Sequence, residues 1–418
     1  MPKPTKFLIH YSHKETLGHT TRVIAICKAL AKRYPKTSSL HILQGGAPQD
    51  YIRFPDSINV INVPHPFDTR ASFAGIRTLR HTAERAAFTL RATQGIMPDI
   101  FITEFFPFGR LNYMPELLPT LEYLAKKNIP IYASVGYPHL LNLISIQDPA
   151  FKNMLQALFQ RYTKILIHTP PELENRYFEK THTIPALKKA YREFFHSINS
   201  KILYTGYVLP SDTFKATTPI PPATTAHEHT VIVSRGGGAV YPKVIINAIQ
   251  AQAILGNRYR FIIACGPATS AEEQKLFLLF QKKYTAGNIL LLNHIAQLNT
   301  FLKTCAVSVS LGGYNTSVQL MQAGTRAIII PHQHKNSKEP STDQLARSSL
   351  MKANFQSTRI YYADLTPGRL ARAIEKKCQS PRPAPAPKEW FCGATTSANI
   401  LMNGTKHQPM LRQHHVPA

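Results

Sequence analysis

Residues 306–333 read AVSVSLGGYNTSVQLMQAGTRAIIIPHQ, and this stretch decides the fold class. An apolar run ends in two glycines, a helical pattern follows over 315–323, and a second apolar run begins at residue 326. Short, nearly continuous apolar strands joined by a helix are typical of parallel strands that are covered on both faces. The stretch therefore predicts part of a parallel sheet flanked by helices.

The same alternation continues on both sides of this stretch. It extends over residues 230–378, and an independent set of strands and helices occupies the chain before residue 209. We therefore expect an α/β protein with two Rossmann-like, doubly wound parallel-sheet domains. In the first domain the expected strands are 6–12, 40–46, 58–65, 99–106, 130–136, 164–170 and 202–208, and the expected helices are 20–34, 71–95, 116–128 and 149–162. In the second domain the expected strands are 230–234, 260–266, 288–295, 306–313, 326–333 and 360–365, and the expected helices are 240–255, 270–284, 297–304, 315–323, 342–353 and 367–378.

Composition shifts set the expected domain bounds. Residues 210–229 are rich in Pro and Thr and lack apolar periodicity, which is typical of a linker between a domain at 1–209 and a domain at 230–378. A Pro-rich segment and a short helical pattern follow at 379–402, and we expect them to form a return segment. Residues 403–418 are expected to be a disordered tail.

The composition of the chain bounds its function class. Its 418 residues exceed the usual size of one domain, and a hydrophobic fraction of 44% is enough for sizeable cores. The 49 Lys and Arg residues outnumber the 23 Asp and Glu residues, so the formal charge is +26, and both halves of the chain are basic. This balance excludes an acidic solvating protein and points to polyanionic partners, either nucleic acid or an anionic membrane surface.

The five cysteines are widely scattered and form no CxxC pair, which argues against a zinc ribbon and against a disulfide framework. The first apolar run is too short for a signal peptide, and no run approaches the 18 to 20 apolar residues of a membrane span. We expect a cytoplasmic protein that meets a membrane only peripherally, at the inner face of the cell membrane.

Ligands of parallel α/β sheets bind beyond the carboxyl ends of the strands, so the loops there are the places to look for chemistry. His19 follows Gly18 at the start of the first expected helix, where the positive helix end favours a neutral imidazole that can act as a general base. The alternative is that His19 only caps the helix. Arg22, one turn further on, could steady an anion. Glu104 ends the fourth strand and could orient an imidazole, or it could bind backbone N–H groups of the next loop.

Two glycine-rich loops follow strands of the second expected domain. In the first, Arg235 precedes Gly236, Gly237 and Gly238, and a helix then opens with Pro242. Glycines let backbone N–H groups approach a phosphate, and the helix end and the arginine add positive charge. This pattern predicts a diphosphate cradle, with a plain tight turn as the alternative. It is not GxGxxG, so a dinucleotide site is not indicated.

The second loop lies in the opening stretch. Gly312 and Gly313 end a strand, and Asn315 and Thr316 are candidate caps of the next helix. Gln319 follows one turn further in, on a face that could reach a ribose. A weaker candidate, Gln344, follows the next strand along the chain.

In this order, GHTTR, PDIFITEFFPFG, SRGGG and SLGGYNTSVQLMQAGTRAIIIP followed by DQLAR resemble the GT-B glycosyltransferases. The chain is most similar to the family 28 branch that includes the lipid II-forming N-acetylglucosaminyltransferase, and within it to the "predicted glycosyltransferase" group. The resemblance implies two Rossmann-like domains facing across a cleft. It also implies inverting transfer of a hexosyl or N-acetylhexosaminyl group from a UDP-sugar to a hydroxyl acceptor, with a lipid-linked acceptor as one option. No metal and no cofactor other than the UDP-sugar co-substrate is implied.

The resemblance also suggests roles for the loop residues. His19 matches the base of the first loop, and Glu104 falls where an aspartate often sits. Gln319 stands where the family has a ribose-binding glutamate, and an amide cannot accept both ribose hydroxyl protons as a carboxylate can. The glycine-rich run before the histidine is reduced to Gly18. Donor binding is implied for Gly18, Arg235, Gly236, Gly237, Gly238, Gly312, Gly313, Asn315, Thr316, Gln319 and Gln344.

The expected helix 71–95 carries a candidate acceptor or membrane surface. Its arginines fall within an arc of about 140° at 100° per residue, together with Phe73 and Phe88. A basic face with aromatic residues is typical of a surface that binds anionic lipid headgroups, and the alternative is an ordinary solvated face. The arginines assigned to this surface are Arg77, Arg80, Arg85 and Arg91.

Two other functions remain open at this point. A GT-B type UDP-sugar epimerase or hydrolase would share the fold and the donor loops. A basic nucleic-acid-binding protein would explain the charge, but the sequence shows no helix-turn-helix, no zinc spacing and no aromatic-basic RNA-binding pattern. Nucleic acid is therefore the less favoured partner.

Overall fold

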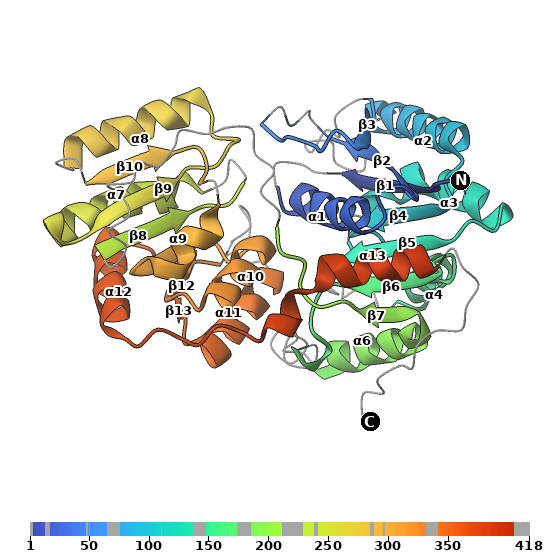
Figure 1. Ribbon diagram of the computed structural model, residues 1–418. Coiled ribbons are helices and arrows are strands. Elements are labelled where there is room, and N and C mark those ends of the chain that lie inside the picture. The colour runs from blue at the N-terminus through green and yellow to red at the C-terminus, as the bar shows by residue number, and fades with distance from the viewer. Residues whose placement is uncertain are drawn as a thin grey trace.

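The described part of the chain forms two α/β domains that lie side by side in the computed structural model (Figure 1). Each domain has one parallel sheet with helices on both faces, which confirms the predicted fold class. The structure describes residues 3–12, 17–46, 49, 51–64, 76–109, 111–136, 148–173, 185–210, 229–237, 241–284, 288–295, 297–331 and 342–404.

The sheet of the N-terminal domain has the strand order β3-β2-β1-β4-β5-β6-β7, with all its pairings parallel. The order reverses direction between β1 and β4, which are adjacent, and such a switch point opens a crevice at the carboxyl ends of the two strands. The strands are β1 (Thr5–Ser12), β2 (Ser38–Gly45), β3 (Ile58–Asn62), β4 (Ile100–Glu104), β5 (Ile131–Val135), β6 (Lys164–Ile167) and β7 (Ile202–Tyr204).

Successive side chains of a strand point to opposite faces of the sheet, and in these strands both sets are apolar. Helices therefore cover both faces. In β1, Phe7 and Ile9 pack towards α1 (Gly18–Arg33), whereas Leu8 packs into the core on the opposite face. Four helices contribute to that opposite core: α2 (Ile76–Ile96), α3 (Met114–Lys126), α4 (Pro149–Gln160) and α6 (Pro185–Ser197). Helix α6 was not among the helices predicted from the sequence.

The C-terminal domain repeats the plan with the order β10-β9-β8-β11-β12-β13, and its switch point lies between β8 and β11. Its strands are β8 (Thr230–Ser234), β9 (Arg260–Ala264), β10 (Ile289–Leu292), β11 (Val307–Ser310), β12 (Ala327–Ile329) and β13 (Thr358–Arg359). One face carries α7 (Pro242–Leu255), α8 (Ala271–Tyr284) and α12 (Pro367–Gln379), and the other carries α9 (Leu298–Thr304), α10 (Tyr314–Ala323) and α11 (Thr342–Phe355).

The stretch at 306–333 forms β11, α10 and β12, as predicted. The strand predicted at 360–365 is wrong: strand pairing ends at Arg359, and Tyr362–Asp364 forms a 3₁₀ turn. The N–H of Ile360 still donates to Ile329 at the end of β12 (3.0 Å), and the chain then leaves the edge of the sheet in the 3₁₀ turn.

The last helix among the described residues, α13 (Gly393–Asn403), returns to the N-terminal domain and lies beside α1 (Figure 1). Ala398, Leu401 and Met402 share the core of α1, and the hydroxyl of Tyr34 donates a hydrogen bond to Asn399 (3.1 Å). A helix at the end of the C-terminal segment thus helps to complete the N-terminal core. Of the linker predicted at 210–229 and the disordered tail predicted at 403–418, residues 211–228 and 405–418 lie outside the described residues, whereas Asn403 is the last residue of α13. No described helix is long and apolar enough to cross a bilayer.

Candidate active site

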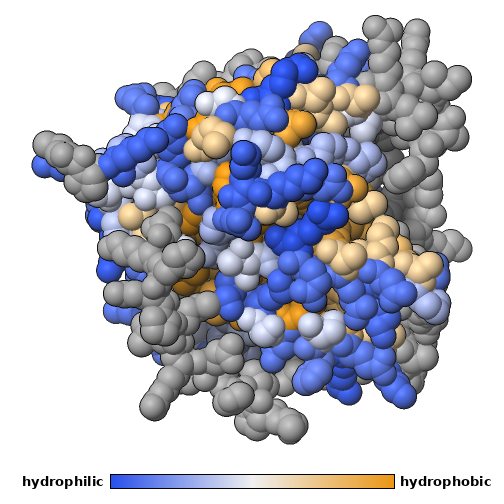
Figure 2. Space-filling model, turned by 90° about the vertical axis from the view of Figure 1, so that its right-hand side faces the viewer, coloured by the Kyte–Doolittle hydropathy of each residue, from blue (hydrophilic) through white to orange (hydrophobic). Residues whose placement is uncertain are grey.

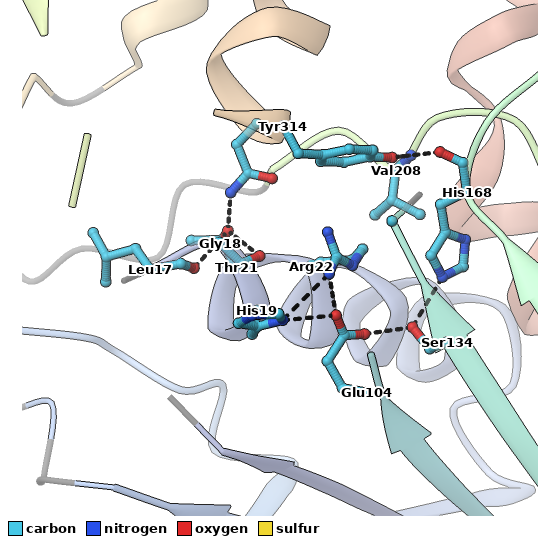
Figure 3. A network of polar contacts seen from close by, with 12 residues as sticks. Leu17, Gly18, His19, Thr21, Arg22, Glu104, Ser134, His168, Val208 and Tyr314 are labelled. Atoms are coloured by element: carbon cyan, nitrogen blue, oxygen red, sulfur yellow. Dashed lines mark hydrogen bonds and ion pairs between the residues drawn. The ribbon is translucent and has the colours of Figure 1, made fainter. Parts of the chain in front are cut away.

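His19 and Glu104 meet at the switch point of the N-terminal sheet (Figure 3). The first turn of α1 carries His19, and Glu104 is the last residue of β4, the strand beside β1. His19 Nδ1 lies 3.1 Å from Glu104 Oε1, and the imidazole lies against the ring of Phe105 at 5.4 Å between centroids. The His19 side chain is 15% exposed while that of Glu104 is fully buried, so only the imidazole is within reach of a ligand.

The surroundings of Glu104 keep its carboxylate ionised. Burial by itself would raise its pKa, but the charge of Arg22 and the hydrogen bond with His19 outweigh burial and lower the pKa to about 2. Side chains hold the carboxylate: besides His19 and Arg22, Ser134 Oγ donates a hydrogen bond to it at 2.5 Å. An ionised Glu104 accepts the Nδ1–H of His19, which leaves Nε2 as the basic nitrogen of that ring.

Arg22 forms an ion pair with Glu104 instead of facing an open anion site. Its side chain is packed against Gly136, where an added Cβ would lie 2.5 Å from Nη1. The guanidinium also lies over the ring of Tyr314, 5.0 Å from the centroid. Arg22 therefore stabilises the ionised carboxylate of Glu104, which contacts His19.

A buried hydrogen-bond chain continues behind Glu104 (Figure 3). Ser134 Oγ lies 2.9 Å from His168 Nε2, and His168 Nδ1 lies 2.7 Å from Thr205 Oγ1. Because Ser134 uses its only proton on Glu104, it must accept the Nε2–H of His168, whose Nδ1 then accepts from Thr205. Burial lowers the pKa of His168 to about 3, so this ring is neutral at physiological pH.

Sequence reasoning missed this chain, although a signal for it exists. Ser134 is the penultimate residue of β5, His168 directly follows β6, and Thr205 directly follows β7. Polar residues at the carboxyl ends of successive apolar strands meet at one edge of a parallel sheet, and this recurrence could have marked them.

A cavity of about 320 Å³ lies between the two domains. The N-terminal domain contributes Leu17 and Thr21, from the same turn of α1 that carries His19. Asn315 Nδ2 of α10 donates to Thr21 Oγ1 at 2.5 Å, whereas the buried Oδ1 of Asn315 has no hydrogen-bond partner within the described residues. The lining residues of the C-terminal domain come from the ends of its strands and the starts of its helices. They are Ser234 at the end of β8, Gly236 and Gly237 after it, Ala264 at the end of β9 and Pro267 after it, Asn293, His294 and Ile295 after β10, Gln297, Leu298, Asn299 and Thr300 at the start of α9, and Asn315, Thr316 and Gln319 of α10.

The cavity brings together five of the residues assigned to donor binding: Gly236, Gly237, Asn315, Thr316 and Gln319. The positive end of α10 and the glycine turn after β8 border it, as expected for an anion site. 

Other assigned residues do not line the cavity. Gly18 begins α1 beside the lining residue Leu17. Gly312 has a φ of +75°, and an added Cβ would lie 2.7 Å from Ile329, so this glycine is required by the turn and its packing. Gly313 is the N-cap of α10, and Gln344 lies in the first turn of α11. Gly238 lies outside the described residues.

The expectation for Arg235 needs correction. Its side chain is buried, and it is bonded to the backbone oxygen of Cys265, to Thr269 (2.9 Å) and to Glu273 (2.7 Å). Its charge is neutralised inside the C-terminal domain and does not face the cavity. An arginine next to a glycine loop can turn inward when a carboxylate, here 38 residues further along the chain, compensates its charge.

The proposed surface on α2 also needs correction. Arg85 is 2% exposed and forms a two-point ion pair with Glu116 (2.8 and 3.0 Å), whose other partner is His10 (3.2 Å). Arg85 therefore faces the core with Ala86 and Thr89, and Phe88 packs there too. Arg91 is exposed, whereas the side chains of Arg77 and Arg80 lie outside the described residues. At this end of the molecule hydrophilic residues cover most of the surface and separate the hydrophobic ones (Figure 2).

Comparison with known proteins agrees with this architecture. Residues 227–401 match the model of the glycosyltransferase family 28 C-terminal domain. Similar solved structures include the glycotransferase of kitacinnamycin (14% identity, 96% of this chain and 99% of that chain, TM-score 0.61) and MurG of Acinetobacter baumannii (13%, 96% and 100%, 0.51). A proposed UDP-N-acetylglucosamine 2-epimerase of Listeria monocytogenes is also similar (10%, 100% and 100%, 0.55). No curated protein sequence matches the chain significantly.

At identities this low, the structural similarity establishes a shared fold alone. The family match covers the domain that carries the glycine loops and most of the cavity wall. The chain therefore has the GT-B fold, and its residues 227–401 match the glycosyltransferase family 28 C-terminal domain.

Proposed function

We propose that the protein is an inverting glycosyltransferase that moves a hexosyl or N-acetylhexosaminyl group from a UDP-sugar to a hydroxyl acceptor. One observation carries this proposal: a single turn of α1 presents His19, backed by Glu104, and also lines the cavity with Leu17 and Thr21. The candidate base and the cavity therefore meet at the same turn of α1. The family 28 domain supports a nucleotide sugar as the occupant.

The reaction in this site is a single displacement. His19 Nε2 takes the proton of the acceptor hydroxyl. At the same time the oxygen of this hydroxyl forms a bond to C1 of the sugar, from the side opposite the leaving group. The bond between C1 and the diphosphate oxygen breaks, and its electron pair leaves with UDP. The ionised Glu104 stabilises the imidazolium that forms on His19.

Negative charge builds up on the leaving diphosphate. With Arg235 turned away, the backbone N–H groups of Gly237 and of the start of α10 are the groups that would stabilise this charge. Gln319 lies on the cavity wall, where its amide would bind the ribose. We propose that these groups suffice without a metal ion, so transfer should survive EDTA.

We propose no acceptor more specific than a compound with a free hydroxyl group. A lipid-linked acceptor would need a surface that favours anionic headgroups, and the arginine arc expected to provide it is interrupted by the buried Arg85. Both soluble and lipid-extract acceptors therefore belong in the assay.

The test is UDP release from a panel of UDP-sugars, with and without acceptor pools, combined with the anomeric configuration of the product. Transfer should require His19, so His19→Ala should lower the rate by roughly 10²- to 10⁴-fold while UDP binding changes little. His41→Ala is the matched control, since His41 lies in β2 and bonds Asn59 (3.3 Å) away from the cavity. Full activity of His19→Ala would refute the assignment of the base. Acceptor-independent turnover would instead indicate an epimerase or hydrolase.

A further inference from the structure

Tyr314 lies next to the cavity-lining residues of α10 and contacts the N-terminal domain behind the His19–Glu104 pair. It is the first residue of α10, and the next two residues, Asn315 and Thr316, line the cavity. Its side chain points away from its own domain towards the N-terminal domain (Figure 3). The helix turn that borders the cavity therefore also touches the residues behind the base.

The phenol oxygen of Tyr314 joins two buried backbone groups. Its hydroxyl donates to the carbonyl oxygen of His168 (2.8 Å) and accepts from the N–H of Val208 (3.0 Å). Both His168 and Val208 are 0% exposed. A phenol can donate and accept at once, whereas phenylalanine would leave both groups without this partner.

From Tyr314, two short routes lead to the carboxylate of Glu104. The ring lies under the guanidinium of Arg22, which is ion-paired with Oε1. The residue that its hydroxyl binds, His168, holds Ser134 through Nε2, and Ser134 donates to Oε2. Oε1 of Glu104 is thus held by Arg22, which contacts the ring of Tyr314. Oε2 is held by Ser134, which is bonded to His168, the residue that the Tyr314 hydroxyl binds.

We propose that Tyr314 is a positioning residue that couples occupancy of the donor cavity to the orientation of Glu104 and, through it, of His19. The inference rests on the proposed function of this site. A diphosphate at the start of α10 would restrain the turn that contains Tyr314, and the two routes would pass that restraint to the carboxylate. The base would then be held in its working geometry when donor is bound.

The first experiment compares Tyr314→Phe with Tyr34→Phe. Tyr34 is a matched control because its hydroxyl also joins the N-terminal domain to a later segment, at Asn399 of α13, away from Glu104. Tyr314→Phe should lower kcat at least about tenfold with little change in UDP affinity, because the lost contacts act on the base and not on the nucleotide. Unchanged kcat in Tyr314→Phe, with an active wild-type protein, would overturn the inference and leave the proposed function standing.

A second readout does not depend on turnover. The Nε2–H of His168 is buried and bonded to Ser134, so it should give a slowly exchanging ring signal in protein labelled with ¹⁵N-histidine. UDP should shift this signal in the wild type and in Tyr34→Phe, and by clearly less in Tyr314→Phe, which keeps the ring under Arg22 but loses the hydroxyl contact with His168. No UDP-dependent shift in the wild type, or an equal shift in Tyr314→Phe, would overturn the coupling. Failure of the wild type to transfer any sugar would count against the proposed function alone.

Discussion

Glu104→Gln replaces the carboxylate behind His19 by a neutral group of the same shape. The Gln oxygen must face Arg22 and His19, because the opposite orientation would point an amide N–H at the guanidinium. Ser134 is then left facing an amide N–H, and its own proton loses the acceptor it has in the wild type. The buried guanidinium of Arg22, 4% exposed, keeps its charge but loses its counter-ion.

The pKa of Glu104 sets the size of the effect on stability. Its folded-state pKa of about 2 lies below the ordinary value of 4.5, so the ionised form contributes stability that is fully present above pH 4.5. The difference corresponds to about 3 kcal/mol at 1.36 kcal/mol per pKa unit. This contribution is lost as the pH falls from 4.5 towards 2, and at pH 4 it should be about 1 kcal/mol smaller than at pH 7.

Urea unfolding at pH 7 and pH 4 measures this contribution directly. Glu104→Gln should be less stable than the wild type by about 3 kcal/mol at pH 7, with a smaller gap at pH 4. Glu122→Gln is the control, since Glu122 is 46% exposed and its pair with Arg161 is 3.4 Å long, so it should cost less than about 1 kcal/mol. A gap for Glu104→Gln that matches this control, or one that does not change with pH, would refute the reasoning.

Three further predictions concern buried arginines and their carboxylate partners. Gly136→Ala should reduce transfer while the protein stays folded, because the added Cβ displaces Arg22 from Glu104; equal activity of this variant and the wild type in steady-state kinetics would contradict it. Arg235→Met should destabilise the protein by about 3 kcal/mol in urea unfolding, without changing the salt dependence of UDP binding, since Arg235 compensates Glu273 inside its own domain. Arg85→Met should cost roughly 3–5 kcal/mol because it leaves Glu116 buried without its arginine, whereas Arg91→Ala should change the stability by less than about 0.5 kcal/mol; similar costs for the two variants in thermal unfolding would show that the arginines are equivalent.

The pairing of His19 with Glu104 could be anticipated from local sequence. Glu104 ends one apolar strand and His19 opens the helix after another, and the carboxyl ends of neighbouring parallel strands meet at one edge. The glycine loops at residues 236–237 and 312–313 could be placed in the same way. Strand–loop–helix order is a short-range property, so it can be read from the chain without knowledge of long-range contacts.

The positions of Arg85 and Arg235 could not be anticipated in this way. Helical angles place Arg85 on a basic arc, but Glu116, 31 residues away, provides a buried counter-charge that turns it inward. Arg235 stands beside glycines that do border the cavity, yet Glu273 holds its side chain on the other side of the loop. The direction of a charged side chain depends on where its partner folds, and local pattern does not contain that information.

Periodicity and glycine placement were enough to define two parallel-sheet domains and the edges where chemistry belongs, because strand and helix patterns depend on neighbouring residues. Tertiary structure decided which polar groups meet at those edges: the chain from Glu104 through Ser134 to His168, and the bridge from Tyr314 across the domains. These contacts join segments from 30 to 146 residues apart, and they form only when packing removes water and makes each buried polar group find a partner.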